Sequence, residues 1–163
     1  MQFHISLLEQ LTRTSQCLLK TILCNTSSKQ VERDQAASVS LGDRMVVIGG
    51  RGAQSGITAS QLELYDPEED VWNVRDDLAL EVGRFSFCAI PLNSSSLMVL
   101  GGWSSSGQPL ASAEILDLDT GSWRPGPQLT RPRYGHTCLL TEMGGRQGVM
   151  VAGGALTGPF YWQ

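Results

Sequence analysis

The stretch SLMVLGGWSSSGQPLASAEILDLDTGSW, residues 96–123, decides the fold of this 163-residue chain. An apolar run ends in two glycines, a polar loop follows, and an alternating segment leads to Asp117 and then to Trp123. The apolar run is too short for an ordinary helix and is typical of a strand that is buried on both faces. The glycine, serine and proline residues around it favour tight turns. The stretch therefore predicts short strands, and it contains no recognisable catalytic pattern.

The double glycine recurs along the chain at a constant step. It ends an apolar run at Gly50, at Gly102 and at Gly154, so that successive pairs lie 52 residues apart. Two further series recur 51 residues apart, an aspartate and a tryptophan six residues after it: Asp66 and Trp72, then Asp117 and Trp123. Registered series of this kind are the mark of an internal structural repeat.

Each repeat has the pattern of four short strands. In the middle one, RFSFCAI, LMVLGG, SAEILDL and GSWRPGPQL alternate with turn-forming residues, as hairpin-connected strands do. With these four strands, the double glycines and the PRYGH segment at residues 132–136, the sequence resembles the kelch family over about residues 31–158. The resemblance weakens where Leu116 replaces the usual tyrosine, and where Ala36 and Phe87 stand in the place of His136.

The resemblance implies an all-β fold of kelch-type β-propeller blades, about two and a half four-stranded antiparallel blades in number. We expect one blade over residues 31–80, a second over 81–130 and an incomplete one over 131–163. A complete propeller has 4–8 blades, so we expect a fragment of a longer kelch protein. Its open sheet edges predict contact with the remaining blades or self-association.

Residues 1–30 do not belong to the repeat. Leu8, Leu11, Leu18 and Ile22 fall on one face of a helix, which predicts a short N-terminal helix, although a loosely ordered end also fits. Such a helix would serve to dock a partner or would end a preceding domain.

Most repeated residues are expected to shape the fold. The glycines permit positive φ and close backbone approach, the tryptophans pack between neighbouring blades, and the arginines hold the turn between blades. The predicted structural residues are Gly49, Gly50, Tyr65, Asp66, Trp72, Arg84, Gly101, Gly102, Asp117, Trp123, Arg133, Gly153 and Gly154, and Arg33 begins the arginine series.

Loop residues that vary between repeats are better candidates for binding, because rigid scaffolds carry function on their loops. In kelch proteins the loop after the double glycine and the loop into the next blade open on one face. Carried over by position, the predicted partner-binding residues are Arg51, Gln54, Phe85, Ser86, Trp103, Ser104, Tyr134 and Gly135. Trp103 could alternatively be a loop aromatic that packs on the next blade.

The predicted function is non-catalytic protein–protein interaction, with no cofactor and no metal. The resemblance also implies a possible role as the substrate-recognition part of a ubiquitin-ligase adaptor. The alternatives are an actin-binding kelch protein and a fragment of a copper enzyme resembling galactose oxidase. A copper site needs histidine and tyrosine ligands, whereas the chain has only His4, outside the repeat, and His136, at a common kelch position.

Composition limits the classes of partner and the cellular compartment that we expect. A net charge of −4 argues against nucleic acid, and no apolar run is long enough to span a membrane. The four cysteines (Cys17, Cys24, Cys88 and Cys138) match no zinc spacing and are expected to be free thiols. We therefore expect a cytoplasmic protein, with secretion as the alternative, in which case the sequons at Asn25 and Asn93 would matter.

Overall fold

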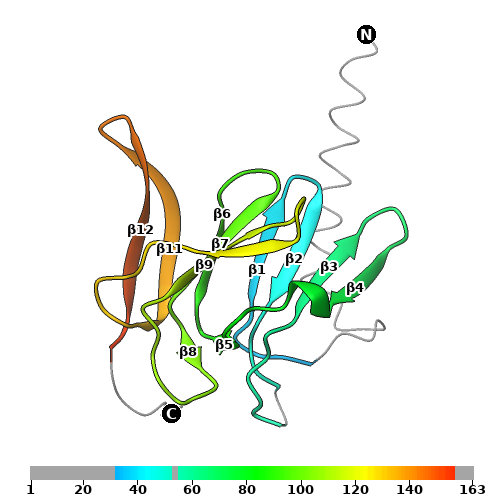
Figure 1. The fold of residues 1–163 in the computed structure, drawn as a ribbon, viewed down its shortest axis with the longest axis horizontal. Helices are drawn as coiled ribbons and strands as arrows, with labels where there is room; N and C mark the ends of the chain where they lie inside the picture. Colours follow the sequence, from blue (N-terminus) through cyan, green and yellow to red (C-terminus); the bar gives the residue numbers. More distant parts are fainter. Residues whose placement is uncertain (1–31, 53–54, 157–163) are drawn as a thin grey trace.

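A computed structural model describes residues 32–52 and 55–156, and antiparallel strands dominate it (Figure 1). The first unit is a four-stranded sheet in the order β1-β2-β3-β4, comprising β1 (Ala37–Leu41), β2 (Arg44–Ile48), β3 (Leu62–Asp66) and β4 (Val71–Arg75). A short 3-10 helix, η1 (Asp76–Leu78), follows it. The N-terminal helix predicted for residues 1–30 lies outside the described residues.

The second unit repeats this arrangement in the order β10-β9-β7-β6. Its strands are β6 (Cys88–Pro91), β7 (Ser96–Leu100), β9 (Ala113–Asp117) and β10 (Ser122–Pro125). The third unit is a hairpin of two ten-residue strands, β11 (Tyr134–Met143) and β12 (Arg146–Ala155). Two short strands, β5 (Arg84–Phe85) and β8 (Trp103–Ser104), pair with each other. The predicted all-β fold of kelch-type blades is confirmed.

The second unit is covered on both faces, and alternation along its strands explains how. Leu97, Val99 and Leu116 lie in one core cluster with Val39 and Ile48 of the first unit. The residues between them belong to a second cluster, against which the third unit packs; its buried members are Ile90, Met98, Leu100, Ala113 and Ile115. All five residues of β7 are buried as a result. This matches the sequence expectation of a strand buried on both faces.

The first glycine of each of the first two pairs lies close to the main chain of the next unit. Gly49 and Gly101 have φ values of 63° and 59°, in the left-handed region. A Cβ added to either would lie 2.7 Å from a carbonyl oxygen of the next unit, that of Arg84 or that of Arg133. No other residue fits both the backbone angle and the space.

The repeated arginines connect their own unit as well as the neighbouring one. The Arg84 guanidinium donates to the carbonyl of Gly101 at 3.0 Å and pairs with the Glu114 carboxylate on β9. The Arg84 carbonyl in turn accepts the N–H of Gly50 in the preceding unit at 2.9 Å. The side chain therefore holds strands of one unit together, whereas the sequence analysis placed it in the turn between units. Arg84 contacts the preceding unit through its main-chain carbonyl.

Burial dominates the electrostatics of these pairs. The Arg84 side chain is fully buried, and burial lowers its pKa from the ordinary value even though Glu114 opposes the change. The first unit has the same arrangement: burial lowers the pKa of Arg33 and raises the pKa of Glu63, while each charge partly offsets the effect on the other. Buried ion pairs of this kind are expensive to break from one side only.

The other repeated residues occupy equivalent places in the two complete sheets. The Oδ1 atoms of Asp66 and Asp117 each accept two backbone N–H groups in the turn that follows. The Trp72 ring contacts Tyr65 of its own sheet at 5.2 Å between centroids. Trp123 donates from Nε1 to the carbonyl of Leu78, a residue of η1, at 3.1 Å.

One expectation about the cysteines is wrong. Cys88 and Cys138 form a disulfide, with their Cα atoms 6.0 Å apart. They are 50 residues apart, close to one repeat, and they lie on the first strands, β6 and β11, of neighbouring units. The absence of a zinc spacing led to the expectation of free thiols, whereas the repeat brings this pair of cysteines together. The bond also removes the cysteine-based argument for a reducing compartment.

Candidate functional site

Loops from all three units gather at one end of the molecule, the lower end in Figure 1. We call this end the loop face and define it as residues 34–35, 51–58, 84–86, 103–109 and 134–135, of which residues 53–54 lie outside the described part. Backbone pairing joins its segments: Asp34 pairs with Arg51, and Phe85 of β5 pairs with Trp103 of β8. The loop face is therefore a connected structure rather than a set of independent loops.

An arginine and three aromatic rings form a continuous strip across the loop face. The Arg51 guanidinium lies 5.3 Å from the centroid of the Phe85 ring, in a cation–π contact. Phe85 is the cross-strand neighbour of Trp103. The Trp103 and Tyr134 rings meet edge to face, with centroids 4.8 Å apart. The strip thus joins one side chain of the first unit, two of the second and one of the third.

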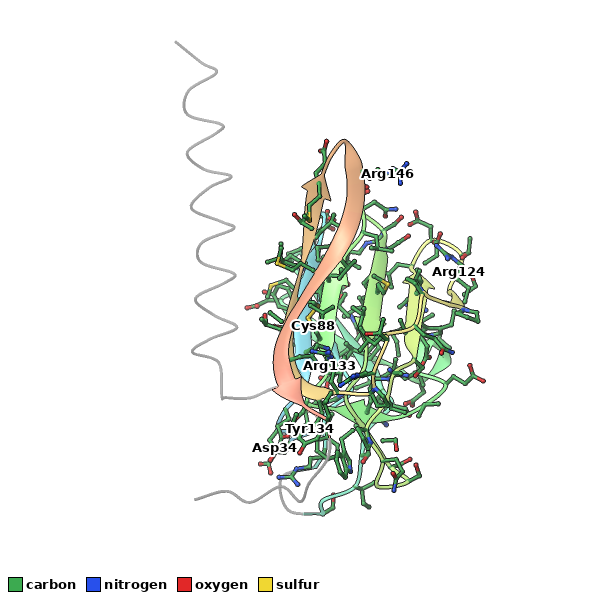
Figure 2. The ribbon with its side chains drawn as sticks, turned by 90° about the vertical axis from the view of Figure 1, so that its left-hand side faces the viewer. Asp34, Cys88, Arg124, Arg133, Tyr134 and Arg146 are labelled. Atoms are coloured by element: carbon green, nitrogen blue, oxygen red, sulfur yellow. A yellow bond between two sulfur atoms is a disulfide. The ribbon has the colours of Figure 1, made fainter. Side chains whose placement is uncertain are left out.

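A backbone ladder runs beside this strip. Gln35, Ser86 and Gly135 lie at equivalent positions of the three units, and all three have φ between 52° and 64°. The N–H of Gly135 donates to the Ser86 carbonyl at 2.7 Å, and the N–H of Ser86 donates to the Gln35 carbonyl at 3.0 Å. A non-glycine residue with φ in this left-handed range lowers the stability of the fold by about 1–2 kcal/mol, and such backbone strain concentrates at functional sites. Figure 2 shows Asp34 and Tyr134 at this end.

The loop after the second double glycine is fixed by its own hydrogen bonds. The N–H of Ser104 donates to the Gln108 carbonyl at 2.9 Å, and the Ser104 hydroxyl contacts both Ser106 and Gln108. An isolated bridge pairs Trp103 with Pro109. The segment is thus preorganised and needs little ordering to bind a partner.

The structure brings the described predicted binding residues together but gives them different exposure. Arg51, Ser86 and Trp103 are half-buried, and Gly135 is exposed. The remaining three, Phe85, Ser104 and Tyr134, are buried. These three side chains therefore contribute little exposed surface to the loop face. Gln54 lies outside the described residues.

Two residues of the loop face, Ile57 and Asp34, were not predicted from the sequence. Ile57 is 71% exposed, the largest exposure among the large hydrophobic residues that the structure describes. Asp34 holds Arg51 in place, with 2.9 Å between Oδ1 and Nε. Both could have been predicted from their positions in the repeat, because Ile57 lies in a loop after the double glycine and Asp34 directly follows a repeated arginine.

Titratable groups near the loop face are few. His136 is buried beneath it, and burial, aided by the charge of Arg133, lowers the pKa of its imidazole. Over the described ranges 32–52 and 55–156, no three His, Cys, Asp or Glu side chains lie together in a way that could hold a metal ion. Within the same ranges no helix has the length and apolar character required to cross a bilayer.

Comparison with known proteins agrees with this repeat. The family model described as the Kelch motif matches residues 32–77 and again 84–130, more than half of the chain. The human kelch repeat and BTB domain-containing protein 12 is 29% identical over an alignment of 136 residues that covers 75% of this chain and 21% of that protein. An F-box/kelch-repeat protein of Arabidopsis thaliana is 31% identical over 109 residues, 66% of this chain and 28% of its own length.

A third relative, kelch-like protein 35 of Mus musculus, is 30% identical over 102 residues, covering 63% of this chain and 16% of that protein. The chain spans less than a third of the length of these relatives. The family match coincides with the two four-stranded sheets and includes their double glycines, repeated arginines and repeated tryptophans. The chain therefore belongs to the kelch-repeat family.

Proposed function

We propose that the chain is a non-catalytic protein-interaction module that binds a partner protein through the loop face. The observation that carries the proposal is the exposed Ile57 in the same loop as Arg51, which begins the strip running to Trp103. Exposed apolar, aromatic and arginine side chains on a preorganised backbone are what anchors of protein interfaces require. The loop face has these residues and is held rigid by the sheets beneath it.

The buried members of the strip have a supporting role in this proposal. Phe85 and Tyr134 fix the positions of Arg51 and Trp103, so that the partner meets a surface already in its bound form. The Asp34–Arg51 ion pair leaves the strip close to neutral. A partner that presents an apolar side chain toward Ile57 and Trp103 therefore fits better than a strongly charged one.

Variants of exposed residues test the proposal without disturbing the fold. Ile57→Ser removes an apolar side chain from the loop face, and Met143→Ser removes one of similar exposure, 69%, from the hairpin tip at the opposite end. We expect affinity capture from cells, quantified by mass spectrometry, to lose a specific partner about tenfold with Ile57→Ser and not with Met143→Ser, as for an interface anchor. Equal recovery with both variants and the wild type would overturn the assignment.

We further propose that the bound protein is a substrate of a ubiquitin ligase. The support is that relatives of this chain include proteins named for a BTB domain or an F-box together with kelch repeats. In that case ubiquitylation of the captured partner falls when Ile57→Ser replaces the wild-type chain in cells. A partner that is captured through Ile57 but whose ubiquitylation is unchanged would contradict the ligase role and leave the binding role standing.

A further inference from the structure

The Cys88–Cys138 disulfide joins two strands that belong to different sheets. Cys88 begins β6, which pairs with β7, and Cys138 lies in β11, which pairs with β12. Both cysteines pack against the apolar cluster between the second and third units, whose members include Met98 and Leu100. Figure 2 shows Cys88 beside the hairpin of the third unit. The bond therefore fastens β11 to the second unit.

The disulfide lies at the margin of this cluster and not at its centre. Met98 and Leu100 are each 3% exposed, whereas Cys88 and Cys138 are only half-buried. Disulfides that are exposed to solvent exchange with small thiols more readily than deeply buried ones, because exchange requires a thiolate to reach a sulfur atom. The position of this bond is therefore suited to reversible reduction.

The face of β11 that carries Cys138 also carries part of the loop face. Side chains alternate along a strand, so Tyr134, His136 and Cys138 point to the same side of β11. Tyr134 and His136 are buried, and the Tyr134 ring meets the Trp103 ring of the second unit edge to face, at 4.8 Å. Cys138 thus continues the row of side chains through which β11 packs on the second unit.

The main chain beside Cys88 carries the opposite half of that contact. Ser86, two residues before Cys88, accepts the N–H of Gly135 at 2.7 Å, and Gly135 lies three residues before Cys138. The disulfide and this hydrogen bond therefore close a short ring, with one link at each end. Opening the disulfide removes the covalent restraint on the hydrogen bond and allows this end of β11 to open locally.

We propose that Cys88 and Cys138 form a redox switch that sets how tightly the loop face binds its partner protein. In the disulfide form, Tyr134 holds Trp103 and the loop face is preorganised. In the dithiol form, β11 opens more often and the binding form is less populated, so affinity falls. The effect on binding rests on the proposed function of the loop face. A role with a ubiquitin ligase agrees with a switch, because disulfides of cytosolic proteins are usually transient and redox-sensing.

The switch needs a dithiol reductant and a peroxide oxidant. A thiolate of the dithiol attacks one cysteine sulfur, the Cys88–Cys138 bond breaks, and the displaced cysteine leaves as a thiolate that takes up a proton. The second thiol of the reductant displaces the other cysteine, so the chain gains two electrons and two protons and the reductant becomes a disulfide. Hydrogen peroxide converts one thiolate to a sulfenic acid with loss of hydroxide, and the other thiolate displaces a second hydroxide to re-form the bond.

Hydrogen exchange on the full chain tests the switch without a partner. The disulfide form is compared with the chain reduced by dithiothreitol, and alkylation followed by mass spectrometry verifies the state of each cysteine. Reduction should speed exchange of the Gly135 amide about tenfold and leave the amides of β3 in the first unit unchanged. Hydrogen peroxide should restore the slow exchange. Equal exchange of Gly135 in the two forms would overturn the proposal, and so would a bond that excess dithiothreitol leaves intact in the folded chain.

Two double variants assign the response to this pair of cysteines. The variant Cys17→Ser with Cys24→Ser keeps the disulfide and should respond to dithiothreitol as the wild type does. The variant Cys88→Ser with Cys138→Ser should exchange as the reduced wild type does, whether or not dithiothreitol is present. A redox response that persists in this second variant would contradict the assignment.

The effect on binding is measured with a cell lysate whose thiols have been blocked with N-ethylmaleimide. Immobilised wild-type chain in its reduced form should recover about fivefold less of the Ile57-dependent partner than the disulfide form, because the loop face is less preorganised. Equal recovery by the two forms would overturn the link between the switch and binding. If Ile57→Ser leaves capture by the disulfide form unchanged, the proposed function fails, whereas the exchange of Gly135 still decides whether the switch exists.

Discussion

The second and third units begin with the same local structure and differ in what surrounds it. In each, the arginine donates to the carbonyl of the first glycine, at 3.0 Å from Arg84 to Gly101 and at 2.9 Å from Arg133 to Gly153. In the second unit the guanidinium also meets Glu114 and is fully buried, and both sheet faces are covered. In the third unit, Met150 remains 45% exposed.

The difference between the two units shows which contacts the repeated residues form by themselves and which depend on the neighbouring strand and unit. The apolar run and the double glycine are sufficient to form the arginine–glycine contact in both units. Burial, and with it most of the energy, comes only from the third strand and from the next unit. Equivalent substitutions in the two units should therefore have unequal effects.

The largest effect is expected from the ion pair. Arg84→Met leaves the carboxylate of Glu114 buried without its partner and should lower the free energy of unfolding by about 3–5 kcal/mol. Arg133→Met, at the partly exposed equivalent in the third unit, should cost less than about 1 kcal/mol. Urea unfolding followed by tryptophan fluorescence measures both. Similar losses from the two variants would remove the distinction between the units.

Loss of the disulfide is expected to have the next largest effect on stability, because the bond joins the third unit to the second. Replacing Cys88 and Cys138 by alanine opens a loop of 50 residues and should cost about 2–4 kcal/mol. The double variant of Cys17 and Cys24 serves as the matched control. Thermal unfolding of the oxidised and reduced forms provides the measurement. If reduction leaves the wild-type midpoint unchanged, the two sulfurs are not bonded in solution.

Equivalent glycines should differ in a similar way. Gly101→Ala combines a φ of 59° with a Cβ 2.7 Å from the carbonyl oxygen of Arg133, so we expect a loss of about 2–3 kcal/mol. Gly153→Ala has a φ of 72° but no atom within 4 Å of its Cβ, and should cost about 1 kcal/mol. The midpoints of chemical denaturation rank the two. A larger loss at Gly153 would show that another unit packs against the third.

The smallest effect concerns pH. Burial and then Arg133 lower the pKa of His136 below 6.5, so the unfolded chain takes up a proton more readily than the folded one. The stability contribution of the neutral imidazole is therefore present above pH 6.5 and is lost as the pH falls toward the folded pKa. His136→Phe, which copies Phe87 of the second unit, should flatten this decline. Unfolding midpoints between pH 7.5 and pH 5 test it, and an unchanged slope would contradict the burial of a neutral histidine.

The sequence was a good guide to the repeat, because each repeated residue meets a local requirement. The positive φ at Gly101 and the turn that follows Asp117 are both set within a few residues of chain. The gathering of loop residues at one end was also predictable, since it follows from the order of strands. These features need no knowledge of the neighbouring units.

The features that the sequence analysis missed depend on contacts between repeats. Phe85 and Tyr134 were expected on loops, but they lie in β5 and β11 and are buried, because Arg51 and Trp103 of other segments pack against their rings. The Cys88–Cys138 bond joins two units, and a search for cysteines one repeat apart would have found it.

Hydrogen exchange on the unmodified chain tests the central comparison most directly. Strand β7 lies between β6 and β9, whereas β12 has only β11 beside it among the described strands. We expect amides of β7 to exchange about a hundredfold more slowly than the alternate amides of β12 that face its open edge. Equal protection of the two strands would contradict it, because the β12 edge would then already be covered.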